Sequence, residues 1–379
     1  MNNATVKKTD TYFDDIRPYN ADELPAAMQR IADSELIPSI ANYLMPGADP
    51  EILREKLRNI KNIYELQVGF LKEVIDILVQ KTTTKFDWSG LENIPEKKPY
   101  LFVSNHRDIV LDAMFLQYIL YIGGGHNTCQ ITFGSNLMEH PLVVDFGKAN
   151  KMFRIERGGN RMEFYNNLMH TSEYMRHVIT KEHESVWIAQ RNGRTKDGID
   201  ATDPAIIKMF WMSRRDDKVK SLAELNIVPV AVSYEWESCD KLKTLELYAT
   251  KVNGRYEKRP GEDLNSILTG IMQPKGHVHF HICKPVTEDD LRTMDSNPGD
   301  YFNNIAKLMD ERINSGYMSM SNNFIANDLR SESNKYSSHY TEQQKADFLD
   351  YMKWIEAYKN LDQALLRDIF LGIYGNSVR

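Results

Sequence analysis

Seven short runs rich in β-branched and aromatic residues alternate with helical stretches between residues 100 and 285, and this alternation constrains the fold more than any other feature. The runs are YLFVSN, CQITFGS, MFRIE, SVWIAQ, IVPVAVSYEW, KTLELYA and HVHFHICKP. Helical patterns separate several of them, near 112–122, 161–180 and 204–213. The alternation predicts an α/β fold in which a mixed sheet is flanked by helices on both faces.

Helical patterns also flank this region on both sides. The clearest covers 49–81, where Asp49 can cap a helix and Pro50 suits its first turn. Its apolar stripe consists of Ile52, Leu53, Leu57, Ile60, Tyr64, Leu71, Ile75 and Leu78. We expect the stripe to pack on the rest of the protein, with a position on a bilayer surface as the alternative. After a turn-rich connector at 81–99, the sequence pattern changes from helical periodicity to the alternating strand and helix patterns of the α/β region.

These patterns predict a helical N-terminal region (1–85), an α/β domain (86–290) and a C-terminal helical extension (291–379). The N-terminus lacks the apolar segment of a secretory signal, and no run is long enough to span a bilayer. We therefore expect a cytoplasmic protein whose membrane contact is peripheral. The three cysteines are few, far apart and odd in number, so neither a disulfide framework nor a CxxC metal site is indicated. No metal or cofactor is expected.

Charge is unevenly distributed along the chain. The net charge of −6 argues against a nucleic-acid partner. Between Lys151 and Lys220, however, 14 Lys and Arg residues stand against 10 Asp and Glu residues. This local excess of positive charge suits an anionic ligand.

Three histidines alternate along the last β-type run. His277, His279 and His281 would share one face of a strand, a geometry that can present imidazoles to a metal ion. No acidic or cysteine ligand is evident nearby in the sequence. We therefore interpret the face as exposed and polar, opposite an apolar face formed by Val278, Phe280 and Ile282.

The stretch SNHRDIVLDAMF (104–115) carries the clearest candidate chemistry. His106 ends a predicted strand that leads into a helix, and the carboxyl edge of an α/β sheet is where ligands usually bind. A histidine held by a carboxylate, here Asp108 or Asp112, can act as a general base that activates an alcohol. Alternatively, His106 is an ordinary buried histidine and the aspartates cap the helix.

Several blocks in order resemble the glycerol-phosphate and lysophosphatidic acid acyltransferases. GLENIPEKKPYLFVSNHRDIVLDA is similar to the family's first block, with its Ser-Asn-His strand end and a His-x4-Asp pair. NKMFRIERGG, QRNGRTKDG and IVPVAVSYE resemble the second, third and fourth blocks, and KGHVHFHICKPV resembles the late strand. Together they span about half of the chain. The helical segment ahead of them resembles the layout of the soluble plastid-type enzymes.

The resemblance implies transfer of a fatty acyl group from acyl-CoA or acyl carrier protein to the hydroxyl of glycerol 3-phosphate or a lysophospholipid. His106 would be the base, with Asp112 as its acid partner or Asp108 in its place. The implied phosphate-binding residues are Arg157, Arg194 and Lys196, with Arg154 and Arg191 as lesser candidates. Asn105, Gly193 and Pro229 complete the motif residues.

The sequence departs from the family pattern at two positions. The residue five beyond His106 is Leu111, and the acid follows one position later at Asp112. A loop with one extra residue ahead of the helix could restore the contact. In the third block, Arg191 stands where the family has glutamate. The two departures motivate an alternative function, that of a catalytically inactive acyltransferase-like protein that binds lipid or acts as a scaffold.

Overall fold

The computed structural model describes residues 11–138, 140–156, 158–295 and 298–378. Within these residues one sheet has seven strands in the order β1-β7-β6-β2-β5-β3-β4, and β6 and β7 are its antiparallel pair. The strands are β1 (Thr83–Ser89), β2 (Leu101–Ser104), β3 (Gln130–Gly134), β4 (Met152–Ile155), β5 (Val186–Ala189), β6 (Ile227–Tyr234) and β7 (Gly276–Ile282). The predicted mixed sheet is confirmed.

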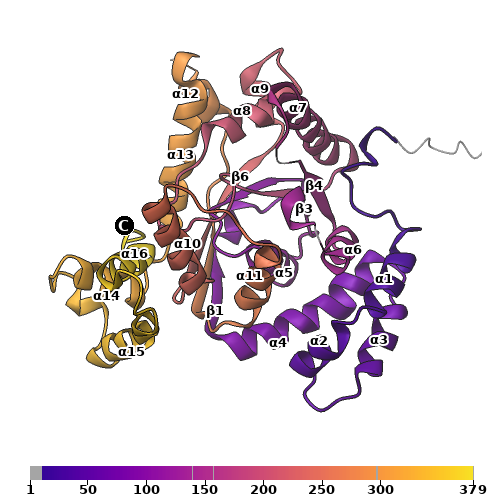
Figure 1. Ribbon diagram of the computed structural model, residues 1–379. Helices are drawn as coiled ribbons and strands as arrows, with labels where there is room; N and C mark the ends of the chain where they lie inside the picture. The colour runs from indigo at the N-terminus through magenta and orange to yellow at the C-terminus, as the bar shows by residue number, and fades with distance from the viewer. Residues whose placement is uncertain (1–10, 139, 157, 296–297, 379) are drawn as a thin grey trace, which may run out of the picture.

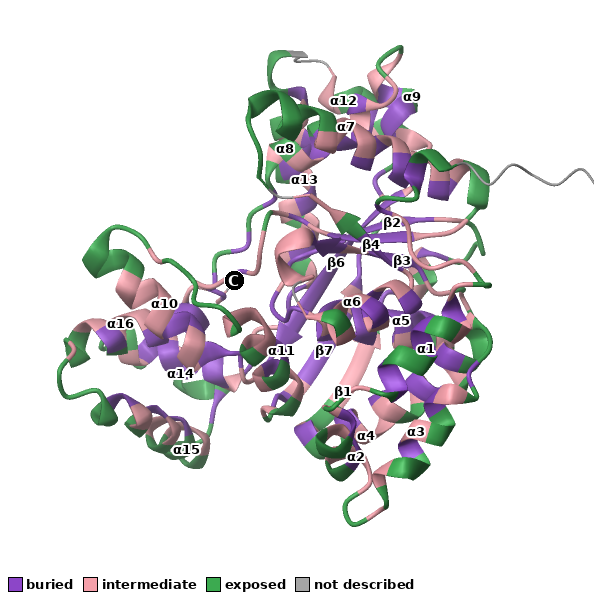
Figure 2. Cartoon of the chain, turned by 45° about the vertical axis from the view of Figure 1, so that its right-hand side comes forward, coloured by how far each residue is buried: buried purple, intermediate pink, exposed green. Residues whose placement is uncertain are grey.

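Helices cover both faces of this sheet (Figure 1). On one face α5 (Leu111–Gly124), α4 (Lys72–Thr82) and α11 (Glu262–Met272) contribute to one apolar cluster with the strands. On the other face a second cluster is formed with α7 (Arg161–His177), α8 (Pro204–Met212), α9 (Lys218–Ala223), α12 (Glu288–Met294) and α13 (Tyr301–Gly316). Figure 2 shows the inner strands buried between the two layers.

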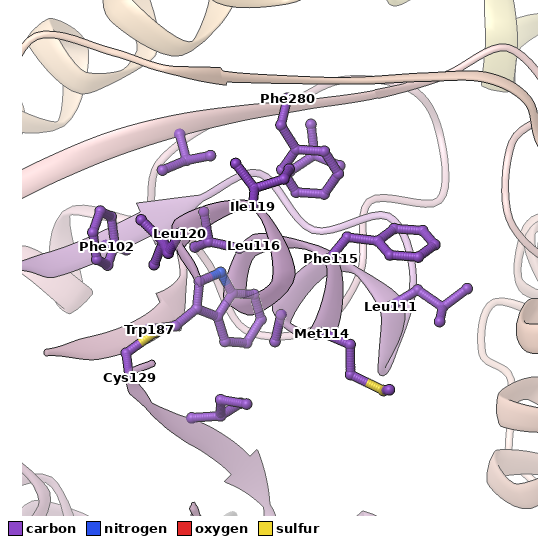
Figure 3. Close-up of a cluster of buried hydrophobic side chains, with 14 of the residues drawn as sticks. Phe102, Leu111, Met114, Phe115, Leu116, Ile119, Leu120, Cys129, Trp187 and Phe280 are labelled. Atoms are coloured by element: carbon purple, nitrogen blue, oxygen red, sulfur yellow. The ribbon is translucent and has the colours of Figure 1, made fainter. Parts of the chain in front are cut away.

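The central strand β2 and the helix that follows it form the core beneath the candidate site. All four residues of β2 are buried, because β5 and β6 flank it and helices cover both of its faces. Helix α5 is apolar around most of its circumference and is buried from Leu111 to Gln117. Its side chains pack with Phe102, Trp187 and Phe280 of the sheet, as Figure 3 shows.

The N-terminal helical pattern folds as separate pieces. Asp49 caps α3 (Pro50–Arg58) as predicted, by accepting a hydrogen bond from the Glu51 amide, but the helix then ends. A π-helical turn (Glu65–Leu71) follows and leads into α4. Most of the predicted stripe packs against α1 (Leu24–Ala32), α2 (Ile37–Leu44), α6 (Pro141–Ala149) or the sheet. Ile52, within α3, and Tyr64, between α3 and α4, are the members of the stripe that are exposed.

Two sequence predictions about strands are wrong. The run KTLELYA lies inside a helix, α10 (Asp240–Asn253), because its apolar residues also recur at helical spacing and the helical pattern continues on both sides. Conversely, β1 lies in the segment interpreted as a connector. Its Thr, Phe and Trp residues favour a strand, but the Gly and Pro residues that follow obscured this signal.

The C-terminal helices form a cluster of their own beside α10. It consists of α14 (Ser321–Arg330), α15 (Glu342–Met352) and α16 (Gln363–Gly375), which pack on Trp236 and on Leu245, Leu247 and Tyr248 of α10. By contrast, α12 and α13 pack in the second cluster of the sheet. Over the described residues, we find no helix with the length and apolar character needed to traverse a bilayer.

Candidate active site

His106 lies immediately beyond the carboxyl end of β2. The side chain of the preceding residue, Asn105, is fully buried and bonds to the next strand, β6. Its Oδ1 accepts a hydrogen bond from the Val232 amide at 2.7 Å, and its Nδ2 donates to the Val232 carbonyl at 2.9 Å. These bonds continue the pairing of β2 with β6 after the strand itself has ended. Asn105 therefore fixes the direction in which the chain delivers His106.

The imidazole of His106 contacts Asp112. Its Nδ1 lies 2.8 Å from Oδ2 of Asp112, whose side chain is fully buried in the first turn of α5. The same oxygen accepts hydrogen bonds from the amides of Arg107 at 2.6 Å and Asp108 at 2.9 Å. The loop ahead of α5 thus wraps around the carboxylate. This wrapping accommodates the extra residue in the motif and brings the acid to the imidazole.

The second carboxylate oxygen of Asp112 accepts a hydrogen bond from the Tyr234 hydroxyl at 2.9 Å. Burial raises the pKa of Tyr234, and the neighbouring charge of Asp112 raises it further, so this hydroxyl stays protonated as a donor. An ionised Asp112 leaves the His106 proton on Nδ1, which donates to it. The lone pair then lies on Nε2, where a general base requires it.

Access to the imidazole is limited but open. The side chain of His106 is 13% exposed, and Trp187 packs edge-on against the ring with centroids 5.5 Å apart. Among the residues that the structure describes, none forms a hydrogen bond with Nε2. The ring is thus held on one edge by Asp112, and its other edge makes no hydrogen bond to the described residues.

Asp108, the alternative acid, is placed as a helix cap. Its Oδ1 accepts from the amides of Val110 at 2.9 Å and Leu111 at 2.8 Å, at the start of α5. Its Oδ2 accepts from the Ser238 hydroxyl. Both oxygens are therefore engaged away from the imidazole of His106.

The third sequence block runs alongside His106. The amide of Gln190 donates to the Ser104 carbonyl at 2.7 Å, and the amide of Thr195 donates to the His106 carbonyl, also at 2.7 Å. Gly193 has φ +78°, a left-handed conformation that favours glycine and turns the loop between these two contacts. Arg194 is therefore the sequence neighbour of a residue, Thr195, whose amide is bonded to the His106 backbone.

Arg194 differs from the other predicted phosphate-binding residues. Its Nη1 is buried and has no hydrogen-bond partner in the described part of the chain. A buried charged donor without a partner costs about 1–3 kcal/mol or more, so this nitrogen is available to an anion. By contrast, Lys196 is paired with Glu246 of α10.

The remaining candidates are placed less favourably. Arg154 pairs with Glu156 at 2.6 Å and its side chain is 44% exposed. Arg191 makes a long contact of 3.5 Å with the Ile199 carbonyl. Arg157 lies outside the described residues. Pro229 lies within β6 opposite Val103, where its carbonyl accepts from the Cys283 amide, so its contacts are those of the sheet.

A buried ionic network next to His106 escaped the sequence analysis. Arg107 is 1% exposed, and its guanidinium bonds to Asp200 and lies 3.3 Å from a carboxylate oxygen of Glu237. Lys243 donates to Glu237 at 2.6 Å and to the Arg107 carbonyl at 2.9 Å. Burial alone would lower the pKa of Arg107, but the charges of Asp200 and Glu237 outweigh it and raise that pKa above its usual value.

The network connects the active-site loop with the end of the chain. Asp200 accepts from the Thr195 hydroxyl at 2.6 Å, and Ser377 lies 3.3 Å from Arg107. The Ser377 hydroxyl also donates to the Gly198 carbonyl at 3.0 Å, and Asn376 donates to the Asp197 carbonyl at 2.9 Å. The end of α16 thereby packs on the third sequence block. In the sequence, this network is indicated only by a charged residue, Arg107, between the predicted site residues His106 and Asp108.

Comparison with known proteins gives one family and a solved structure. The protein-family model described as Acyltransferase matches residues 85–233. A matching solved structure is the 1-acyl-sn-glycerophosphate (LPA) acyltransferase, PlsC, from Thermotoga maritima. The TM-score is 0.36 and the identity 15%, with 76% of this chain and 94% of that chain covered. The comparison with curated proteins gave no match.

Proposed function

Since residues 85–233 match the Acyltransferase family, we propose that the protein moves a fatty acyl group from acyl-CoA or acyl carrier protein to a hydroxyl of glycerol 3-phosphate or a lysophospholipid. The observation that carries this proposal is the 2.8 Å contact between His106 and Asp112 at the carboxyl edge of β2. That contact leaves Nε2 for the acceptor. The same contact removes one of the two reasons for an inactive protein, the shifted position of the acid.

The proposed reaction needs no covalent enzyme intermediate. Nε2 of His106 takes the proton of the acceptor hydroxyl while the hydroxyl oxygen attacks the carbonyl carbon of the thioester. When the tetrahedral adduct collapses, the carbon–sulfur bond breaks and the imidazolium returns its proton to the departing sulfur. Asp112 keeps the imidazole in the required tautomer and stabilises its protonated form.

The proposed acceptor site uses Arg194. Its buried, unpartnered Nη1 can donate to a phosphate oxygen of the acceptor. Purified protein is expected to acylate glycerol 3-phosphate or lysophosphatidic acid, and to leave glycerol and monoacylglycerol unmodified. If neither acyl-CoA nor acyl carrier protein yields product with any of these acceptors, the inactive lipid-binding alternative is favoured.

In that assay, Arg194→Ala is expected to raise the acceptor KM about tenfold or more, the size of one charge-assisted hydrogen bond, with little change in the donor KM. Arg255→Ala serves as the control, since that side chain is 81% exposed and pairs with its neighbour Glu257. Equal increases in both KM values would contradict the assignment of Arg194 to the phosphate.

We also propose that the start of α7 contacts the membrane surface from which a lipid substrate comes. Met162, Phe164 and Tyr165 are 67%, 47% and 42% exposed in the first two turns of this helix. Arg161 beside them is exposed too, and Arg215 bonds to the Tyr165 hydroxyl at 2.5 Å. Apolar side chains accompanied by arginines are typical of helices that lie in a lipid interface.

Phe164→Asp is expected to weaken binding to vesicles containing anionic lipid about tenfold, because one aromatic side chain contributes about 1.5–3 kcal/mol on burial. Cosedimentation measures this, and turnover of water-soluble glycerol 3-phosphate should be unchanged. Ile52→Asp is the matched comparison, since Ile52 is 54% exposed on α3. A loss with Ile52→Asp alone would instead place the N-terminal helices on the bilayer.

A further inference from the structure

The histidines of β7 have an acidic neighbour that the sequence analysis did not find. Asp87 of β1 lies in register with His279, because β1 pairs with β7 in parallel. Val278, Phe280 and Ile282 face the apolar cluster that contains α5, so Asp87 and the histidines lie on the opposite face of the sheet. The interpretation that no acidic ligand lies nearby is therefore wrong. It failed because β1 had been assigned to a connector.

Three side chains converge on that face. Oδ1 of Asp87 lies 2.9 Å from Nε2 of His277 and 2.6 Å from Nδ1 of His279. Each of the three residues offers one ligand atom, and these ligand atoms all lie within 4.8 Å of one another. The side chain of His279 is 9% exposed, that of His277 19% and that of Asp87 31%, so the cluster is largely covered and still reachable from solvent.

The other nitrogen of His279 is also held. Its Nε2 lies 3.1 Å from the Ser89 hydroxyl, which in turn lies 2.8 Å from Nδ1 of His281. A hydrogen bond of this kind on the far nitrogen fixes the tautomer and the ring plane of a metal-binding histidine. It leaves Nδ1 of His279 directed at Asp87.

We propose that Asp87, His277 and His279 bind one divalent transition-metal ion of the zinc class. Two imidazole nitrogens and one carboxylate oxygen are a donor set that Zn²⁺ and Co²⁺ accept, with a fourth position left for water or another ligand. Bonds of about 2.0–2.2 Å in a tetrahedral shell place neighbouring ligand atoms about 3.3 Å apart. The cluster reaches that spacing with shifts of less than about 1 Å.

The charges around the cluster are compatible with a cation. Lys85 is the opposing charge. It lies 2.6 Å from Oδ2 of Asp87, the oxygen outside the cluster, and its side chain is 62% exposed. It can therefore turn into solvent while Oδ1 binds the ion.

The site would join β1, at the edge of the sheet, to β7. The test uses untagged full-length protein, treated with a chelator and then titrated with Co²⁺ or Zn²⁺ near neutral pH. We expect one ion per chain by calorimetry, the visible absorption of four-coordinate Co²⁺, and a higher Tm with the ion bound.

Asp87→Asn and His277→Gln should each raise the Kd at least tenfold. His170→Gln is the matched control, because His170 also pairs with an aspartate, Asp15, and its side chain is 20% exposed, but it belongs to α7 and not to the β1–β7 pair, so it should leave the Kd unchanged. Circular dichroism of each variant shows whether it is folded. Because His277 is partly exposed, His277→Gln is expected to disturb the fold less than a change at a buried residue. The proposal is overturned if the wild-type protein binds no ion at a 1:1 ratio, or if binding persists in the Asp87→Asn/His277→Gln double variant.

Discussion

His106→Ala is expected to lower the rate of acyl transfer by about 10²- to 10⁴-fold, the usual contribution of a positioned general base. The imidazole is held by Asp112 at 2.8 Å, and its other nitrogen bonds to none of the described residues. Removing the ring leaves the acceptor hydroxyl without a proton acceptor. The loss should appear mainly in kcat, measured with acyl-CoA or acyl carrier protein and the best phosphate-bearing acceptor.

Variants at the two aspartates sharpen this experiment. Asp112→Asn should also reduce kcat strongly, because an amide in place of the carboxylate no longer selects the tautomer or stabilises the imidazolium. Asp108→Asn is the matched control, since its side-chain oxygen can still accept from the Val110 and Leu111 amides. Full activity in His106→Ala would remove the base from the mechanism. A loss in Asp108→Asn without one in Asp112→Asn would exchange the roles of the acids.

Arg107→Met is expected to reduce the free energy of unfolding by about 3–5 kcal/mol, the usual effect of breaking a buried ion pair by removing one partner. Asp200 and Glu237 would remain buried with Lys243 as the one cation that this network retains. Urea unfolding measures the shift in midpoint, with the slope m checked for constancy. Activity should fall as well, because the same network holds the loop that contains Thr195 against the His106 carbonyl.

Arg292→Met is the control for this second experiment. Arg292 pairs with Glu288 across one turn of α12, with both side chains about half exposed, and such pairs contribute about 0–1 kcal/mol. If Arg107→Met also lowers the free energy of unfolding by less than about 1 kcal/mol, then burying Asp200 and Glu237 without the arginine costs little. The network would then have no measurable part in stability.

Local patterns in the sequence were enough to predict most of the sheet. Six predicted strands are present, from β2 to β7, because each combines β-branched or aromatic residues with turn residues at its ends. The ordered blocks resemble those of acyltransferases, and the family model described as Acyltransferase matches residues 85–233. The domain boundaries and the roles of the site residues stay predictions. KTLELYA was misassigned because seven residues are too few to separate the periods of strand and helix.

The sequence by itself determined that a histidine would follow a strand and that acids and arginines would follow it in order. Tertiary structure alone decided which acid reaches the imidazole, since that depends on how the loop from Arg107 to Val110 wraps around Asp112. It also decided which residues bond to Arg107 and that Asp87 contacts His279. These contacts join residues that are 93 to 192 positions apart in the sequence. Hydrophobic periodicity reports which face of an element is buried, whereas contacts between distant polar groups arise only when strands pair and helices pack.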